Sequence, residues 1–173
     1  MRFWIMICGL ALCLFTPILA TANPNICRVL KAHPSWQQIA ESTSNKWGVP
    51  VPVQMAIMRV ESNFKAHAKN KRSSAKGFAQ VVNKTWRAYR HSTHAQANRS
   101  SFAAASNFIG WYAQGAHNQL GISPNNAYQL YIAYHNGNGG YKKAMHSKHA
   151  AIKKLAHHVQ QLANIYQTQI ASC

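Results

Sequence analysis

Apolar residues recur every three or four positions through most of the chain, which is the period of helices that bury one face. Between Val53 and Phe64 the apolar positions fall at i, i+3, i+4, i+7 and i+11, and Pro52 suits the first turn of this helix. Alternation with a period of two, which marks half-buried strands, is nearly absent. The pattern therefore predicts a compact all-α domain that ends in a long C-terminal helix.

Turn-forming and capping residues place the other predicted elements. Residues 23–33 are expected to be an irregular lead-in, after which Pro34 opens a helix that Gly48 ends. Asn83 is expected to cap a short helix, and Ser123 to cap another that ends at His135. A further helix is predicted from Phe102 to the residue before Gly121. The segments between helices are a basic loop, 65–76, and a sharp turn, 136–140.

The first residues have the pattern of an export signal. Arg2 supplies a positive start, an apolar run extends from Phe3 to Leu14, and Ala20-Thr21-Ala22 forms a cleavage site. The apolar run is too short for a convincing membrane span. The sequence thus predicts a signal peptide over 1–22, a single domain over 23–173, and a periplasmic or secreted mature protein.

Removal of the signal would leave two cysteines, Cys27 and Cys173, near the two ends of the mature chain. In an oxidising compartment such a pair predicts a disulfide that ties the termini together. Two unpaired thiols are the alternative.

The chain carries 19 Lys and Arg residues against two acidic residues, so its formal net charge is +17. Such a surface favours a polyanionic partner, for which anionic envelope polymers qualify, whereas export argues against nucleic acid. The ten histidines invite a metal site, but no carboxylate or cysteine completes a ligand set with familiar spacing. We expect neither a metal nor a cofactor.

The scarcity of acids directs attention to Glu61, because Glu41 is the only other carboxylate side chain. Glu61 lies at the C-terminal end of the predicted helix 52–64, where burial and the helix dipole would both favour its neutral form. A carboxyl group that stays protonated near neutral pH is what a general acid needs. The alternative is a solvated glutamate at a helix end. Glu41 lies on a polar helix face, where a solvated role is expected.

Cleavage of a glycan is one reaction that a general acid of this kind could carry out. Most glycosidases use two carboxylates for it, but here a single one would have to suffice. Glu61 would protonate the glycosidic oxygen while a 2-acetamido group stabilises the sugar centre. The ionised Glu61 would then remove the proton of the C6 hydroxyl, which attacks C1 in place of water.

Several motifs, in order, resemble the soluble lytic transglycosylase (SLT) family of lysozyme-like proteins. The matching segments are Glu61-Ser62-Asn63-Phe64, Ala68, Gly77-Phe78-Ala79-Gln80, Thr85 and Ala133-Tyr134-His135-Asn136-Gly137. The resemblance implies a helical lysozyme-like fold that cleaves peptidoglycan between N-acetylmuramic acid and N-acetylglucosamine, leaving a 1,6-anhydro end.

The same resemblance implies roles for individual residues. Glu61 takes the place of the catalytic acid, and Gln80 and Tyr134 are expected to line the cleft, with the Tyr134 hydroxyl reaching toward the acid. Substrate contacts are also expected from Ser62, which would hold Glu61 or the substrate, and from Phe78 and His135. The family pattern has Asn where this chain has His135, a change that would make activity more sensitive to pH. Ser74 and Asn83 also depart from the pattern, within loops.

Two other functions stay open at this point. A hydrolytic muramidase would keep the fold but use water, and a non-catalytic basic protein would coat polyanions in the envelope. The protein is expected to be a monomer. Its size suggests a local role, such as opening the wall for a cell-envelope secretion machine, which is an expectation by family analogy.

Overall fold

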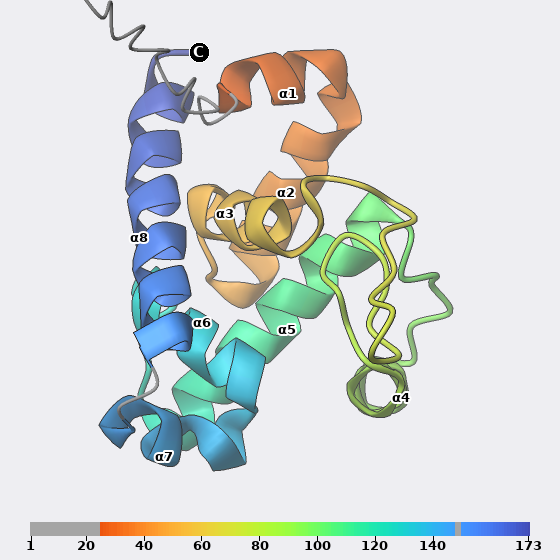
Figure 1. The fold of residues 1–173 in the computed structure, drawn as a ribbon. Helices are drawn as coiled ribbons and strands as arrows, with labels where there is room; N and C mark the ends of the chain where they lie inside the picture. Colours follow the sequence, from red (N-terminus) through yellow and green to blue (C-terminus); the bar gives the residue numbers. More distant parts are fainter. Residues whose placement is uncertain (1–24, 148–149) are drawn as a thin grey trace, which may run out of the picture.

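The computed structural model describes residues 25–147 and 150–173 (Figure 1). Within these ranges the backbone forms helices but no named strand, and its only strand-like pairings are isolated bridges from Lys76 to Lys69 and Val81. The predicted all-α class is confirmed. The helices are α1 (Ile26–Ala32), α2 (Pro34–Trp47), α3 (Val51–Ser62), α4 (Asn83–Thr93), α5 (Phe102–Leu120), α6 (Ala127–Asn136), the 3-10 turn η1 (Asn138–Gly140), α7 (Tyr141–His146) and α8 (Ala150–Ala171).

Short helices and caps account for the local errors of the sequence prediction. The lead-in predicted as irregular contains α1, and α7 was not predicted at all, because helices of six or seven residues are too short to show a periodic stripe. Asn83 does not cap α4 but is its first residue. The cap of α6 is Asn126, whose side chain accepts a hydrogen bond from the backbone N–H of Gln129, and not Ser123.

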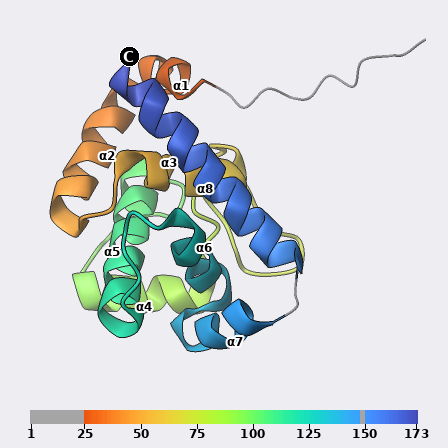
Figure 2. The same ribbon diagram turned by 90° about the vertical axis from the view of Figure 1, so that its left-hand side faces the viewer.

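Helix α3 lies at the centre of the packing. Seven consecutive residues, from Pro52 to Met58, are buried, so the helix is covered on all sides and not only along the predicted apolar stripe. Helix α8 packs against α3 and runs along one side of the molecule past α3 and α6 (Figure 2). The end of α3, where Glu61 lies, is thereby held in place by the core of the domain.

A buried polar cluster fixes α3 against its other neighbours, α2 and α5. The side-chain amide of Gln54 donates to the carbonyls of Ala40 and Val49, each over 2.9 Å. Its Oε1 lies 2.6 Å from Oγ of Ser106, which in turn lies 2.9 Å from Oγ1 of Thr43. Because unpaired buried polar groups are costly, these bonds favour one relative placement of the three helices.

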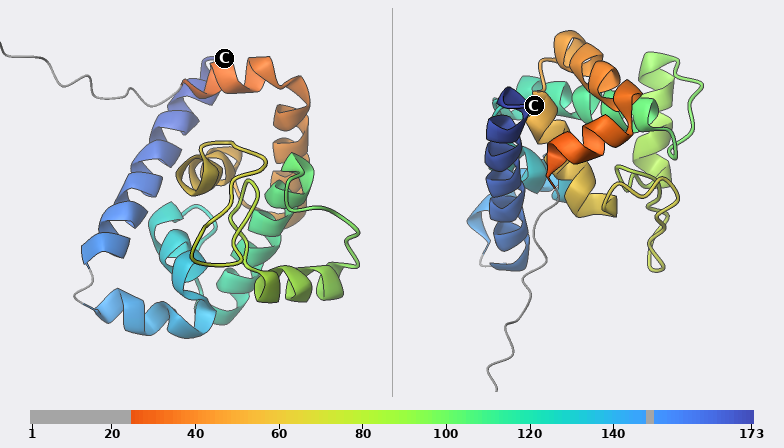
Figure 3. Two further views of the ribbon diagram at one scale, coloured as in Figure 1. Left: turned by 45° about the vertical axis from the view of Figure 1, so that its right-hand side comes forward. Right: turned by 90° about the horizontal axis from the view of Figure 1, so that it is seen from above.

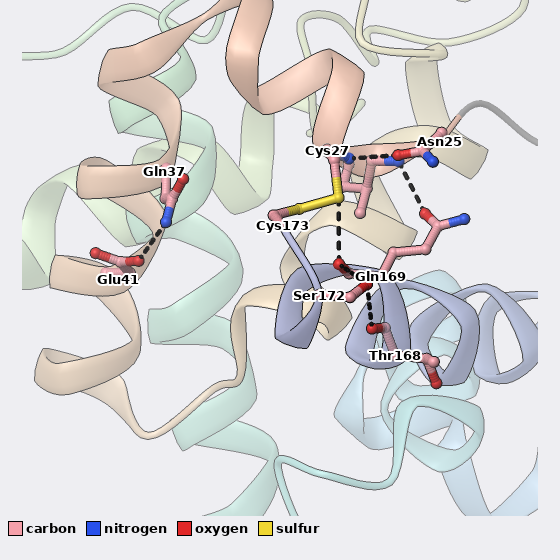
Figure 4. Close-up of a disulfide and its surroundings, with 9 residues drawn as sticks. Asn25, Cys27, Gln37, Glu41, Thr168, Gln169, Ser172 and Cys173 are labelled. Atoms are coloured by element: carbon pink, nitrogen blue, oxygen red, sulfur yellow. Dashed lines mark hydrogen bonds between the residues drawn. A yellow bond between two sulfur atoms is a disulfide. The ribbon is translucent and has the colours of Figure 1, made fainter.

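The predicted disulfide is confirmed. Cys27 of α1 is bonded to Cys173, with their Cα atoms 5.8 Å apart (Figure 4). Beside it, the backbone N–H of Ile26 donates to Oε1 of Gln169 over 2.9 Å, so α1 is attached to the end of α8 by more than the covalent bond. Among the described residues, no helix has the length and apolarity needed to cross a bilayer. The predicted signal peptide over 1–22 lies outside the described residues.

Candidate active site

A cleft of about 500 Å³ opens beside the end of α3. Its walls come from the loop 65–82, which leads from α3 to α4 (Figure 3), and from α4, α5 and α6. The charged, polar and aromatic groups needed for chemistry on a polar ligand are therefore drawn from segments far apart in the sequence. The lining residues are Glu61, Asn70, Ala75, Gln80, Val81, Val82, Thr85, Phe108, Tyr112, Tyr134, His135, Asn136 and Gly137.

Glu61 lies in the last turn of α3, which ends where Asn63 takes a left-handed conformation with φ of 53°. Burial raises the pKa of the Glu61 carboxyl from its ordinary value of 4.5 to about 7, because the charged form loses hydration. A hydrogen bond from the Tyr131 hydroxyl to Oε1, 2.9 Å long, opposes part of this rise in pKa. Near neutral pH the carboxyl is therefore divided between its protonated and ionised forms.

The hydrogen bonding of Glu61 is one-sided. Tyr131 is buried, and burial together with the nearby carboxylate raises the pKa of its phenol, so it stays a proton donor. Within the part of the chain that the structure describes, the second oxygen of Glu61, Oε2, accepts no hydrogen bond and no cation pairs with the carboxyl. One oxygen is thus held by the protein while the other is left for a ligand.

The tyrosine that forms a hydrogen bond with Glu61 is Tyr131. This corrects the expectation that the Tyr134 hydroxyl reaches the Glu61 carboxyl. Tyr134 lines the cleft as predicted, but its hydroxyl donates to the carbonyl of Ala79 over 2.6 Å. The two rings are nearly parallel, at 14°, with centroids 6.3 Å apart. Positions 131 and 134 are one helical turn apart on α6, so this spacing was the signal that could have identified Tyr131.

Gln80 is held at the cleft wall by its own loop. It adopts a left-handed conformation with φ of 46°, and its side-chain nitrogen donates to the carbonyls of Ala68 (3.0 Å) and Gly77 (2.9 Å). The side-chain oxygen of Gln80 has no partner among the described residues and can accept a hydrogen bond from a ligand.

Gly77 explains how this loop can lie so close to the segment 94–101. Its φ is +82°, and a Cβ at this position would lie 2.0 Å from the carbonyl oxygen of Arg99. The Arg99 side chain closes the same contact, donating to the carbonyl of Val81 over 2.6 Å and to Oδ1 of Asn83 over 2.7 Å. The Arg99 side chain therefore helps to hold in place the loop that carries Gln80.

Two predicted substrate contacts, Ser62 and Phe78, are not among the residues that line the cleft. Phe78 is 4% exposed and packs edge-on against Trp36 and Phe102, with ring centroids 5.3 and 5.7 Å away. Ser62 is also buried, and its hydroxyl donates to the carbonyl of Met58 over 3.1 Å. Both residues belong to the supporting structure, since each uses its side chain within the fold.

His135 does line the cleft, as predicted, at the end of α6. Three further residues line the cleft although nothing in the sequence predicted them there: Asn70 from a loop, and Phe108 and Tyr112 from α5. The Tyr112 hydroxyl donates to the carbonyl of Ala133 over 2.6 Å, which joins the cleft wall on α5 to α6. No short motif marks these residues, because only the packing of distant segments brings them to the cleft.

Glu41 is remote from this chemistry. It is exposed on α2, where its carboxylate accepts a hydrogen bond from Gln37 over 3.0 Å (Figure 4). It lines a separate hollow together with residues of α1 and α2, such as Lys31 and Pro34. The predicted solvated position of Glu41 is confirmed. Over 25–147 and 150–173, no three His, Cys, Asp or Glu side chains gather in a way that could hold a metal ion.

Comparison with known proteins gives one family. The family model described as "Transglycosylase SLT domain" matches residues 1–173, which is the whole chain. No curated protein matches the chain.

Proposed function

The chain belongs to the transglycosylase SLT domain family, and from this premise we propose that it is a lytic transglycosylase with Glu61 as its only acid and base. The bond that it cleaves joins N-acetylmuramic acid to N-acetylglucosamine in peptidoglycan, and the product carries a 1,6-anhydro end. The membership supports activity on peptidoglycan. The residue roles and the course of the reaction are the proposed part.

The observation that carries the proposal is the state of Glu61. Because burial raises its pKa to about 7, both the protonated and the ionised form of Glu61 are populated near neutral pH. The same carboxyl can therefore give a proton in one step and take one in the next. Its oxygen Oε2, which has no partner among the described residues, would be the atom that exchanges the proton.

The proposed reaction returns Glu61 to its starting state. Protonated Glu61 gives its proton to the glycosidic oxygen as the bond from that oxygen to C1 breaks, and the 2-acetamido oxygen stabilises the electron-poor C1. The ionised Glu61 then removes the proton of the C6 hydroxyl, whose oxygen bonds to C1. Tyr131 would stabilise the ionised form between the two steps through its hydrogen bond to Oε1.

The positions of the two glutamates favour this route over a two-carboxylate mechanism. Inverting and retaining glycosidases need both carboxyl groups within about 5–9.5 Å of each other, on either side of one bond. Glu41 and Glu61 line different hollows, and the sequence contains no other acidic side chain. A second carboxylate is therefore not at hand in the cleft.

Binding of the glycan would use the polar groups of the cleft wall. The free oxygen of Gln80 can accept a hydrogen bond from a sugar hydroxyl or acetamido N–H, and His135 and Asn70 supply further polar groups. The ring of Tyr134 offers an apolar face. Because peptidoglycan lies outside the cytoplasm, the protein would work there after removal of the predicted signal peptide, and the basic surface would hold it near anionic envelope polymers.

Product analysis on purified sacculi tests the proposal. The wild-type protein should release muropeptides that are one water lighter than their reducing-end counterparts. Glu61→Gln should reduce this release by about a hundredfold or more, since proton transfer by a placed side chain contributes about 10²–10⁴ in rate. Glu41→Gln is the matched control and should retain the wild-type rate.

The outcomes separate the other functions. Reducing ends in place of anhydro ends would identify a hydrolytic muramidase. Release that is unaffected by Glu61→Gln would remove Glu61 from the mechanism. Binding to sacculi without any cleavage, weakened steeply by salt, would identify a basic coating protein.

A further inference from the structure

Positive charge is concentrated in one segment of the chain. Residues 65–99 contain nine of the 19 Lys and Arg residues and neither of the two acidic residues. The segment comprises the loop 65–82, helix α4 and most of the segment 94–101 that follows it, and α4 lies at the edge of the molecule opposite α8 (Figures 1 and 3). It therefore contributes a large positive charge without any carboxylate of its own to offset it.

Helix α4 has two faces of different character. Trp86 and Tyr89 are buried and pack against Phe108 of α5, with ring centroids 6.0 and 5.5 Å away. Lys84 and Arg87 are exposed on the opposite face, because residues three positions apart lie on the same side of a helix. The outer face of α4 is thus left to cations, while the aromatic rings hold the helix to the domain.

The loop before α4 adds two cations where this helix begins. Oγ of Ser74 accepts a hydrogen bond of 3.0 Å from the backbone N–H of Asn83, which attaches the tip of the loop to the first turn of α4. Lys71 and Arg72 are exposed at this tip. Together with the two cations of α4 they form what we call the cationic surface. Among the described residues, none of its four side chains forms a hydrogen bond or an ion pair.

The cationic surface suits a ligand that presents several negative charges in a row. Single exposed ion pairs are weak, but several contacts to one chain reinforce each other. A helix that inserts into a bilayer carries large apolar side chains on its exposed face, whereas the large exposed apolar side chains of the described ranges, Val82 and Ile165, lie outside α4. Unpaired nucleic-acid bases would need exposed rings for stacking, and the rings of Trp86 and Tyr89 are buried. Charge alone is therefore left to recognise the ligand.

From these features we infer that the cationic surface binds a linear phosphodiester polymer of the cell envelope, one in which phosphates join polyols or sugars. Guanidinium groups such as that of Arg87 match phosphate oxygens in geometry as well as in charge. The inference goes beyond the proposed function and does not depend on the proton transfers of Glu61. Thr85 lines the cleft but its neighbour Lys84 does not, so the polymer would lie beside the cleft and leave it open for glycan.

Binding of fluorescently labelled poly(glycerol phosphate), followed by anisotropy, tests the inference. The double variant Lys84→Gln with Arg87→Gln should raise Kd about tenfold, the effect of losing two exposed charged contacts. Lys84→Arg with Arg87→Lys keeps both charges and should leave Kd near the wild-type value. Arg28→Gln with Lys31→Gln is the matched control, since it removes the same charge from exposed positions on α1, away from α4 (Figure 1). Its Kd should change less than about twofold.

The salt dependence of binding counts the contacts. Each cation that meets a phosphate of a single strand contributes about −0.7 to the slope of log K against log salt concentration, so four contacts predict a slope of about −3. The slope should become less steep by about 1.4 in the α4 double variant and should not change in the α1 double variant.

Several results would overturn the inference. An equal rise in Kd in the α1 and α4 double variants would mean that net charge alone attracts the polymer. Binding to vesicles that contain phosphatidylglycerol, without binding to the polymer, would identify a membrane surface as the partner. Tighter binding to single-stranded DNA with the same number of phosphates would identify a nucleic acid.

The same measurements separate this inference from the proposed function. Binding of the polymer by the Glu61→Gln protein needs no catalysis, so a failure to find anhydro ends would leave the result intact. Conversely, a wild-type protein that releases anhydro ends but does not bind the polymer at about 0.15 M salt would overturn the inference alone.

Discussion

The hydroxyl of Tyr131 donates to Oε1 of Glu61 over 2.9 Å, which joins α6 to the end of α3 across 70 positions of the sequence. Burial raises the pKa of Glu61, and this bond is the contact that lowers it again. Under the proposed function, Tyr131 therefore helps to set the pH range in which Glu61 can give and take a proton. Since its own ring is buried, the tyrosine is also fixed in place.

Tyr131→Phe should move the pH dependence of activity. Without the donor, the ionised form of Glu61 is less stable, so its pKa rises above about 7. The alkaline limb of the kcat/KM profile should shift upward by about one to two pH units, as expected for the loss of one hydrogen bond to a charge. Tyr128→Phe on the same helix is the control, because Tyr128 does not line the cleft. An alkaline limb that stays in place would show that Tyr131 does not tune Glu61.

Glu61 should make the stability of the fold depend on pH. Its folded-state pKa of about 7 exceeds the ordinary value of 4.5 that applies when the chain is unfolded. Because the folded state binds the Glu61 proton more tightly than the unfolded state, this proton adds to the free energy of unfolding. The contribution is complete below about pH 4.5 and is lost as the pH rises through about 7, by roughly 3 kcal/mol in all. Glu61→Gln should abolish this component and be more stable than the wild type at pH 8.

Urea unfolding at several pH values measures this effect. The difference in the free energy of unfolding between wild type and Glu61→Gln isolates the contribution of Glu61, because every other ionisable side chain is common to the two proteins. Glu41→Gln should show no comparable difference, since Glu41 is exposed. A difference that is constant between pH 5 and 8 would contradict a raised pKa for Glu61.

Gly77→Ala should damage both the fold and the cleft. The added Cβ would meet the carbonyl oxygen of Arg99 at 2.0 Å and would also occupy a backbone conformation with φ of +82°. The loop would have to move, and it carries Gln80 into the cleft. Gly121→Ala measures the cost of the backbone conformation alone, because φ at Gly121 is +70° but no atom lies within 4 Å of the new Cβ.

We expect Gly121→Ala to lower the free energy of unfolding by about 1 kcal/mol and to leave kcat/KM unchanged. Gly77→Ala should cost at least about 2 kcal/mol and also reduce kcat/KM. Denaturant unfolding and rate assays on both variants measure these effects. Equal stability losses in the two variants would mean that the contact with Arg99 is easily relieved.

Loss of the disulfide should lower stability strongly. Cys27 and Cys173 close a loop with a sequence separation of 146, and a cross-link of this length is expected to contribute roughly 5 kcal/mol. Replacing both cysteines by serine should lower the denaturant midpoint accordingly, and treating the wild type with a reductant should reproduce the change. A loss below about 1 kcal/mol would indicate that α1 is held to α8 mainly by other contacts, such as the bond from Ile26 to Gln169.

The sequence by itself determined the helical class, the extent of the longer helices, the disulfide and the position of the acid. Long amphipathic helices and a glutamate at a helix end follow from local periodicity, because burial of one face repeats every turn. The scarcity of acids then singled out Glu61 without any tertiary information. The ordered motifs around Gly77 and Tyr134 added the family.

The tertiary structure decided which side chains meet. Tyr131 and Tyr134 are one turn apart on α6, and nothing local determines which hydroxyl reaches Glu61 and which reaches Ala79. Phe78, in the loop before α4, lies inside an aromatic cluster instead of the cleft because Trp36 of α2 and Phe102 of α5 close around it. Such choices depend on how the helices pack, which is set by contacts between residues far apart in the sequence, and these contacts leave no local period in the sequence.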